Sequence, residues 1–212
     1  MINDLLVVVV LAQTLTAATP LLLAGCGELV AERGGVLNIG IEGLMLTGCI
    51  AAFAVTAITG NSWLGLLVAM GAAMVLGAGF ALMAITARAD QIVAGMALNL
   101  IAVGVSGTVW RALQSHGVTE LPATAGFSRG WFGWSGCLFW SDLPLIGPLF
   151  FDLYGLSIAT AGLLLLTWWV LRRTRIGIVI QAIGELPDAA AAAGESVHRW
   201  RWGVVLFAAA CA

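Results

Sequence analysis

The chain contains no lysine, and all nine of its basic residues are arginine. Charged residues make up 9 % and hydrophobic residues 61 % of its 212 residues, against roughly a quarter and a half in soluble globular domains. This composition predicts a membrane protein. The formal net charge of -2 provides no basic surface, so nucleic acid is excluded as a partner. A phosphate-binding P-loop needs a lysine, so the chain cannot build a Walker A site of its own.

Cysteine and histidine are also scarce. No CxxC pair occurs, and no histidine lies at a metal-ligand spacing from a cysteine. The two histidines fall in polar connections outside the apolar runs, where they cannot activate an intramembrane nucleophile. The sequence therefore predicts no metal site, no catalytic residue and no cofactor bound by this chain.

Apolar runs long enough to cross a membrane recur along the chain. A helix of about 20 residues crosses the ~30 Å hydrocarbon core. Such runs lie at about 4–25, 36–59, 63–85, 92–113 and 154–171. A sixth begins at Trp202 and reaches only about half a crossing before the last residue, so we expect a chain truncated within a helix. The pattern predicts an all-α, polytopic transmembrane helix bundle with about five complete spans plus the start of a sixth.

Arginine placement predicts the orientation of these spans. Seven of the nine arginines fall in connections on one side, around 26–35, 86–91 and 172–201, and two fall on the other side. The positive-inside rule places the group of seven in the cytoplasm. The amino terminus and the aromatic-rich connection 114–153 are then expected outside.

Small residues recur at every fourth position of the third run, at Gly65, Ala69, Ala73, Gly77 and Ala81. They share one helix face that carries no large side chain. Such a face lets another helix approach closely. The pattern indicates tight packing and says nothing about a transported solute.

Three polar side chains inside the apolar runs are candidates for a substrate pathway: Asn38, Glu42 and Asn99. Polar groups in lipid usually face a cavity or a partner helix. Asn99 is compatible with either a bond to a neighbouring helix or a place on a solute path. The stretch 34–43 has four glycines and one carboxylate. It is either a broken helix lining a cavity, or a cytoplasmic turn before a helix whose positive end favours Glu42.

The stretch 184–194 predicts a short surface helix. Pro187 is typical of the first position of a helix, and Asp188 is favourable in its first turn. An alanine run follows as the body of the helix, and Gly194 is typical of its end. The alanines form a smooth face that fits a groove in another protein, which makes the helix a candidate docking element. A simple loop is the alternative interpretation.

Several stretches, in this order, carry a resemblance to a known family. They are TPLLLA at 19–24, GELVAERGGVLNIGIEGLML at 27–46, DQIVAGMALNL at 90–100 and IGELPDAAAAAG at 183–194. Together they resemble the permease subunits of bacterial ABC importers of the ribose, branched-chain amino acid and nucleoside class. The resemblance is closest to the nucleoside or simple-sugar branch. Family permeases are longer, in agreement with the expected truncation.

The resemblance implies a multi-pass protein of the bacterial inner membrane that moves a small polar solute. The implied partners are a cytoplasmic ATPase subunit that binds the ATP, a second permease subunit, and an extracytoplasmic solute-binding protein. It also implies that the segment from 184 to 194 couples the permease to the ATPase, through Gly184, Glu185, Pro187, Asp188, Ala191 and Gly194. Leu186 stands where the family usually has asparagine.

The sequence as a whole predicts a single transmembrane permease domain over 1–212, incomplete at its C-terminus, with a cytoplasmic coupling segment at 172–201. We expect a transport subunit and not an enzyme, since the spans hold no serine–histidine or paired-aspartate constellation. An ion-coupled secondary transporter is the alternative. That mechanism needs intramembrane carboxylates, and Glu42 is the one plausible candidate.

Overall fold

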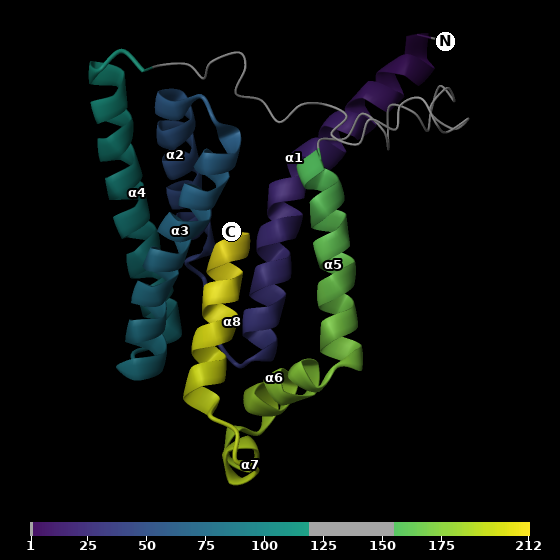
Figure 1. The fold of residues 1–212 in the computed structure, drawn as a ribbon, viewed down its shortest axis with the longest axis vertical. Helices are drawn as coiled ribbons and strands as arrows, with labels where there is room; N and C mark the ends of the chain where they lie inside the picture. Colours follow the sequence, from purple (N-terminus) through teal and green to yellow (C-terminus); the bar gives the residue numbers. More distant parts are fainter. Residues whose placement is uncertain (1, 119–154) are drawn as a thin grey trace. The chain divides into compact units, whose positions relative to one another are not determined.

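The structure is a computed structural model that describes residues 2–118 and 155–212. These residues form helices, with no strand among them (Figure 1). In chain order the helices are α1 (Ile2–Arg33), α2 (Ile41–Thr59), α3 (Ser62–Ala81), the π-helical segment η1 (Leu82–Thr86), α4 (Gln91–Ser115), α5 (Gly155–Arg173), α6 (Arg175–Glu185), α7 (Pro187–Ala192) and α8 (Val197–Cys211). The all-α prediction is confirmed for this part of the chain.

Four stretches of helix are long and apolar enough to cross a membrane, namely Gln13–Arg33, Ile41–Thr59, Ser62–Thr86 and Gln91–Ser115. They correspond to the first four predicted runs. Large apolar side chains on them are exposed, with Val75 and Leu100 each at 75 %. Extensive apolar exposure is untypical of a soluble surface and typical of one that faces lipid.

The remaining predicted spans stay predictions. Helix α5 lies where the fifth run was expected, and α8 begins at Val197, five residues before the expected start at Trp202. Most of the connection predicted at 114–153 lies outside the described residues.

The predicted boundary between the first two runs was wrong. We expected a connection around 26–35, whereas α1 continues to Arg33 and α2 starts only at Ile41. Within the continuing helix, Gly27 lets α8 approach, since a Cβ there would lie 2.8 Å from Cα of Ala208. The connection is residues 34–40, in which Gly35 has φ +76°, a conformation that glycine adopts most readily.

Contacts divide the chain into two compact units. The first comprises 1–23 and 126–166, and the second comprises 24–125 and 167–212. Within the first unit, the hydroxyls of Thr19 and Ser157 form a hydrogen bond of 2.9 Å. The second unit contains every candidate site residue, so the site is described within it.

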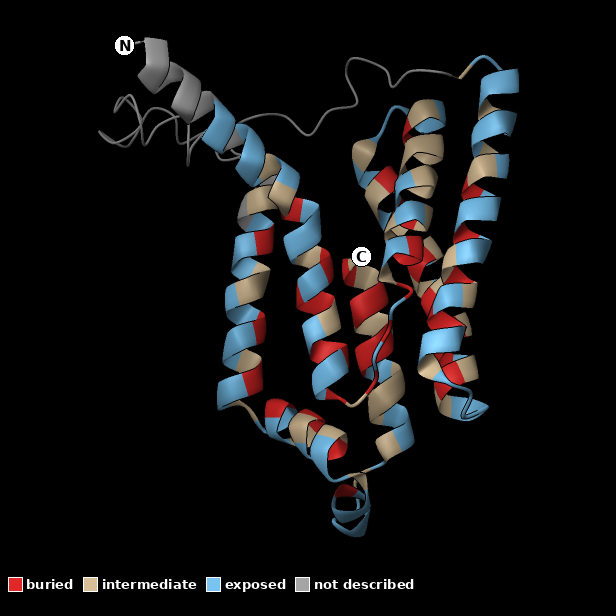
Figure 2. Ribbon diagram, turned by 180° about the vertical axis from the view of Figure 1, so that it is seen from behind, coloured by how far each residue is buried: buried red, intermediate tan, exposed pale blue. Residues whose placement is uncertain are grey.

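The core of the second unit joins the 34–40 connection to four helices. Its fully buried members include Val36 of the connection, Leu44 of α2, Phe80 of α3, Leu98 of α4 and Val205 of α8. Figure 2 shows a dense run of buried residues along α8, whereas much of α4 is exposed. The connection is therefore part of the packed interior of this unit.

The small-residue face predicted on the third run is confirmed as a packing face. A Cβ at Gly65 would lie 3.1 Å from the carbonyl oxygen of Ala52 in α2, and a Cβ at Gly77 would meet the Cβ of Ala209 in α8. Ala73 lies between these two contacts and is buried. The face thus fits α3 against both neighbours.

Candidate functional site

The connection between α1 and α2 is irregular backbone that is held by side chains from other segments. The Leu37 N–H donates to Oε1 of Gln91, at the start of α4, at 2.8 Å. The Asn38 N–H donates to Oε1 of Glu28, in α1, also at 2.8 Å. Backbone N–H groups in an irregular segment lack the partners that a helix supplies, and here two of them find acceptors in side chains of adjacent helices.

Asn99 of α4 joins the connection to the start of α2. Its Nδ2 donates to the carbonyl oxygen of Ile39 at 3.2 Å, and its Oδ1 accepts from the Gly43 N–H at 2.7 Å. Gly43 lies in the first turn of α2, where N–H groups have no partner within the helix. Asn99 therefore caps α2 from a different helix.

Asn38 is buried at 3 % exposure within the connection. Its Oδ1 accepts from the Gly40 N–H at 2.9 Å, which closes a local turn of the kind that asparagine favours. Its Nδ2 and the Glu28 Oε2 are both buried and have no hydrogen-bond partner in the described part of the chain. Such groups are uncommon in folded proteins, so this pair retains unused hydrogen-bonding capacity.

Glu42 lies in the first turn of α2 with its side chain exposed. Within residues 2–118 and 155–212 it forms no hydrogen bond or ion pair. The positive end of the helix favours its carboxylate. The structure thus brings Asn38 and Asn99 to the same connection but leaves the Glu42 side chain outside their network. Both interpretations of the stretch 34–43 remain open. The turn that leads into α2 fits a simple connection before a helix, and the irregular backbone buried in protein fits a broken helix that lines a cavity.

Glycines let α4 approach this connection. A Cβ at Gly95 would lie 2.9 Å from the backbone nitrogen of Gly40, and a Cβ at Gly43 would lie 3.0 Å from Cα of Asn99. Side chains at these positions would push α4 away from the connection. The asparagine then could not reach the backbone groups that it binds.

The short helix predicted after Pro187 is confirmed as α7. Pro187 occupies its first position, Asp188 lies in its first turn, and Gly194, just past its end, has φ +90°. Ala190 is buried at 5 %, whereas Ala191 is exposed. The helix therefore presents part of its alanine run outward.

Gly184 of α6 lies against the α1–α2 connection. A Cβ at Gly184 would clash with the carbonyl oxygen of Arg33, and a Cβ at Gly35 would lie 3.0 Å from Cα of Gly184. Backbone therefore meets backbone at this point. The segment predicted to couple to an ATPase touches the same connection that Asn38 and Asn99 stabilise.

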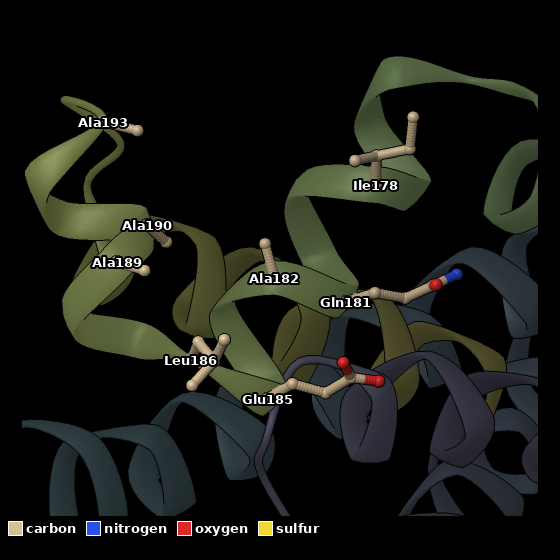
Figure 3. A pocket seen from close by; sticks show the side chains of 8 residues that line it. All are labelled: Ile178, Gln181, Ala182, Glu185, Leu186, Ala189, Ala190 and Ala193. Atoms are coloured by element: carbon tan, nitrogen blue, oxygen red, sulfur yellow. The ribbon is translucent and has the colours of Figure 1, made fainter.

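An open groove of about 440 Å³ lies between helices α6 and α7 (Figure 3). Alanine side chains line its α7 side, Ile178 and Ala182 line its α6 side, and Leu186 stands at the turn between them. The full lining is Ile178, Gln181, Ala182, Glu185, Leu186, Ala189, Ala190 and Ala193. Of the predicted coupling residues, Glu185 lines the groove and Ala191 does not. The groove was not predicted, because the sequence analysis identified no helix at 175–185.

Two residues of the network were missed from the sequence, Glu28 and Gln91. Both lie inside the motifs that carry the family resemblance, Glu28 shortly after the first predicted apolar run and Gln91 directly before the fourth. Their polar side chains beside apolar runs were the signal in the sequence that could have identified them as candidate site residues. Their role could not be derived from it, because their partners lie 10 and 54 positions away along the chain.

Comparison with known proteins adds a family match and several relatives. Residues 10–212 match the family described as branched-chain amino acid transport system / permease component. The putative glucose ABC transporter permease protein TsgC13 of Haloferax volcanii is 38 % identical over 200 residues, covering 92 % of this chain and 57 % of that protein.

Two further relatives are bacterial. The guanosine ABC transporter permease protein NupQ of Bacillus subtilis is 32 % identical, covering 93 % of this chain and 63 % of that protein. The nucleoside ABC transporter permease protein NupC of Lactococcus lactis is 31 % identical, covering 93 % and 62 %. The chain therefore spans less than two thirds of the length of these relatives. No solved structure matches the chain at a significant level.

Proposed function

Because the chain belongs to the permease-component family of branched-chain amino acid transport systems, we propose that it is a membrane-spanning permease subunit of an ATP-driven ABC importer. The observation that carries this proposal is the family match over residues 10–212, which includes the 34–40 connection and the α6–α7 segment. The subunit takes part in solute transport and is not an enzyme. ATP is bound by a partner, since the chain has no lysine for a P-loop.

The proposed cargo is a small polar solute, either a nucleoside or a simple sugar. The relatives at 38, 32 and 31 % identity carry names that specify glucose, guanosine and nucleosides. The proposed partners are a second permease subunit, a cytoplasmic ATPase subunit and an extracytoplasmic solute-binding protein. The proposed location is the bacterial inner membrane.

We further propose that α5 is a fifth span and that α8 begins a sixth, within a single permease domain over 1–212. Helix α5 has 19 residues, close to the length that crosses the hydrocarbon core, and its last turn carries Arg172 and Arg173. Basic residues at a helix end are typical of the cytoplasmic boundary. The segment 172–201 then lies in the cytoplasm.

Within that segment we propose that α7 contacts the ATPase. The exposed part of its alanine run and the contact of Gly184 with the 34–40 connection support this role. Movement imposed on α7 would be transmitted to the 34–40 connection through the backbone contact between Gly184 and Gly35. It would then reach α2 and α4 through Asn99.

We also propose that Asn38, Glu42 and Asn99 border the solute path. The exposed carboxylate of Glu42 at the positive end of α2 supports this, as does the unused Nδ2 of Asn38. Asn99 has a structural role in capping α2, and that role is compatible with a place beside the path.

Uptake measurements in vesicles test the importer function. The full-length protein, assembled with its ATPase and binding protein, should accumulate labelled guanosine or glucose only when ATP is supplied inside. Collapsing the ion gradients with an ionophore should leave uptake unchanged. Uptake that follows an ion gradient and needs no ATP would instead establish the secondary-transporter alternative.

A further inference from the structure

The corner where α5 ends and α6 begins carries three exposed arginines, Arg172, Arg173 and Arg175. Their side chains form no hydrogen bond or ion pair with any described residue. No aspartate or glutamate occurs in the sequence between Asp152 and Glu185. The corner is thus a local concentration of positive charge that no described residue neutralises.

Two tryptophans precede these arginines on α5. Trp168 and Trp169 are exposed by 54 % and 52 %. The Arg172 guanidinium carbon lies 5.7 Å from the centroid of the Trp168 ring. Trp169 and Arg173 have the same spacing of four residues, so each arginine shares a helix face with one indole. Tryptophan is enriched at the headgroup level of membranes.

The order of side chains along α5 fits a crossing from hydrocarbon to headgroups. Four leucines end at Leu166, the tryptophans follow, and the arginines come last. From Leu166 to Arg173 a helix rises about 10 Å, and the headgroup layer is about 5–7 Å thick on each side. The arginines therefore reach the level of the lipid phosphates when the leucines lie in hydrocarbon.

A tight turn keeps Arg175 beside the other two arginines. A Cβ at Gly177 would lie 2.5 Å from Cα of Leu171, so α6 folds back closely on the end of α5. Figure 1 shows that α6 does not continue the line of α5 but runs sideways from its end, toward α8. The three arginines are thereby grouped at one corner of the backbone and are not spread along one extended helix.

We propose that Arg172, Arg173 and Arg175, with Trp168 and Trp169, bind the headgroup of an anionic phospholipid in the leaflet at this end of the protein. Guanidinium groups donate paired hydrogen bonds to phosphate oxygens. The net charge of the corner favours an anionic lipid over a zwitterionic one. This site is separate from the proposed solute path and from the α6–α7 groove, and it would hold the α5–α6 corner at the membrane surface.

Native mass spectrometry of the full-length protein in detergent tests the site, with phosphatidylglycerol as the probe and phosphatidylcholine as the neutral comparison. Each single change, Arg172→Gln, Arg173→Gln or Arg175→Gln, should weaken the first phosphatidylglycerol binding event about five-fold, equivalent to ~1 kcal/mol. Phosphatidylcholine binding should stay as in the wild type, which also shows that the variants are folded.

The matched control removes three exposed arginines that lie outside this corner, through Arg33→Gln, Arg88→Gln and Arg199→Gln combined. It should leave the first phosphatidylglycerol affinity close to that of the wild type. An equal loss in the control would overturn the proposal in favour of general charge attraction. Displacement of the lipid by inorganic phosphate would overturn lipid recognition. Unchanged lipid binding with dissociation of the permease pair in the corner variants would assign the surface to a protein contact instead.

Discussion

In the connection between α1 and α2, amide and carboxylate side chains replace the partners that a regular helix would give the backbone. Gln91 and Glu28 accept hydrogen bonds from the consecutive N–H groups of Leu37 and Asn38. Asn99 donates a hydrogen bond to the carbonyl oxygen of Ile39. A hydrogen bond of this kind contributes about 0.5–1.5 kcal/mol net. Individual residues at this connection therefore affect both the fold and the proposed solute path.

Two substitutions separate these effects. Asn99→Leu should reduce uptake and lower the free energy of unfolding by about 1–2 kcal/mol, because two hydrogen bonds are lost. Glu42→Gln should reduce uptake and lower the free energy of unfolding by at most about 0.3–1 kcal/mol, because the Glu42 side chain contacts no partner in the described residues and loses only its attraction to the positive end of α2. Solute uptake and thermal unfolding in detergent measure the two properties. Unchanged uptake in single variants of Asn38, Glu42 and Asn99 would rule out their place on the path.

The close contact at Gly184 gives a second prediction at this scale. Gly184→Ala should lower the free energy of unfolding by about 1–3 kcal/mol, because the added methyl group meets the Arg33 carbonyl oxygen. Gly203→Ala in α8 is the matched control, since nothing lies within 4 Å of a Cβ there. It should stabilise the helix by about 0.5–1 kcal/mol. Thermal unfolding of both variants checks this, and equal midpoints would refute the contact.

Among the elements, α7 shows how a short helix can expose part of an alanine run without losing its own packing. Ala190 is buried toward the groove, and Ala191 is exposed and does not line it. A large side chain at 191 therefore does not disturb the α6–α7 groove. Any effect of such a side chain on the ATPase reports on an external contact.

Ala191→Trp should weaken co-purification of the ATPase subunit, or uncouple ATP hydrolysis from uptake, by steric clash at that contact. Asp188→Lys should act in the same direction by about 0.3–1 kcal/mol, because it places a positive charge at the positive end of α7. Ala87→Trp is the control, an exposed alanine at the end of η1. Normal association and normal uptake in the Ala191→Trp complex would show that α7 is a plain connection.

The sequence predicted those elements whose signal is local. Long apolar runs identified α2, α3 and α4 to within a few residues, and Pro187 with Gly194 identified α7. The end of α1 was predicted wrongly. Gly27, which falls in the predicted connection, lies inside α1 and accommodates α8, and that contact joins residues 181 positions apart.

Helix α6 and the network at the connection were missed for the same reason. The stretch 175–185 is too short for a span, and its burial depends on α1 and α8. Asn38 and Asn99 could be selected as polar residues in apolar runs. The hydrogen bonds of Asn99 to Gly43 and Ile39 could not be predicted, because local sequence does not encode which backbone group 56 or 60 positions away lacks a partner.

For the whole molecule, the asymmetry of arginines predicts which ends of the helices face the cytoplasm. In a cysteine-free background, a cysteine at Ser115 should react with a membrane-impermeant reagent in intact cells, and one at Ser196 should not. Both serines are exposed, at the end of α4 and just before α8. Burial therefore does not explain a difference in labelling between them. Labelling after cell lysis controls for reactivity, and the reverse pattern in intact cells would invert the topology.

The side chains that hold the 34–40 connection also impose an order on biosynthesis. The backbone N–H groups of Leu37 and Gly43 have their acceptors in α4, which is synthesised 54 and 56 residues later. At about 5–20 residues per second, the ribosome needs about 3–12 s to deliver them. During that interval α1 and α2 are already made while the backbone between them still lacks its final hydrogen bonds. The connection can therefore complete its hydrogen bonding only after α4 has been synthesised.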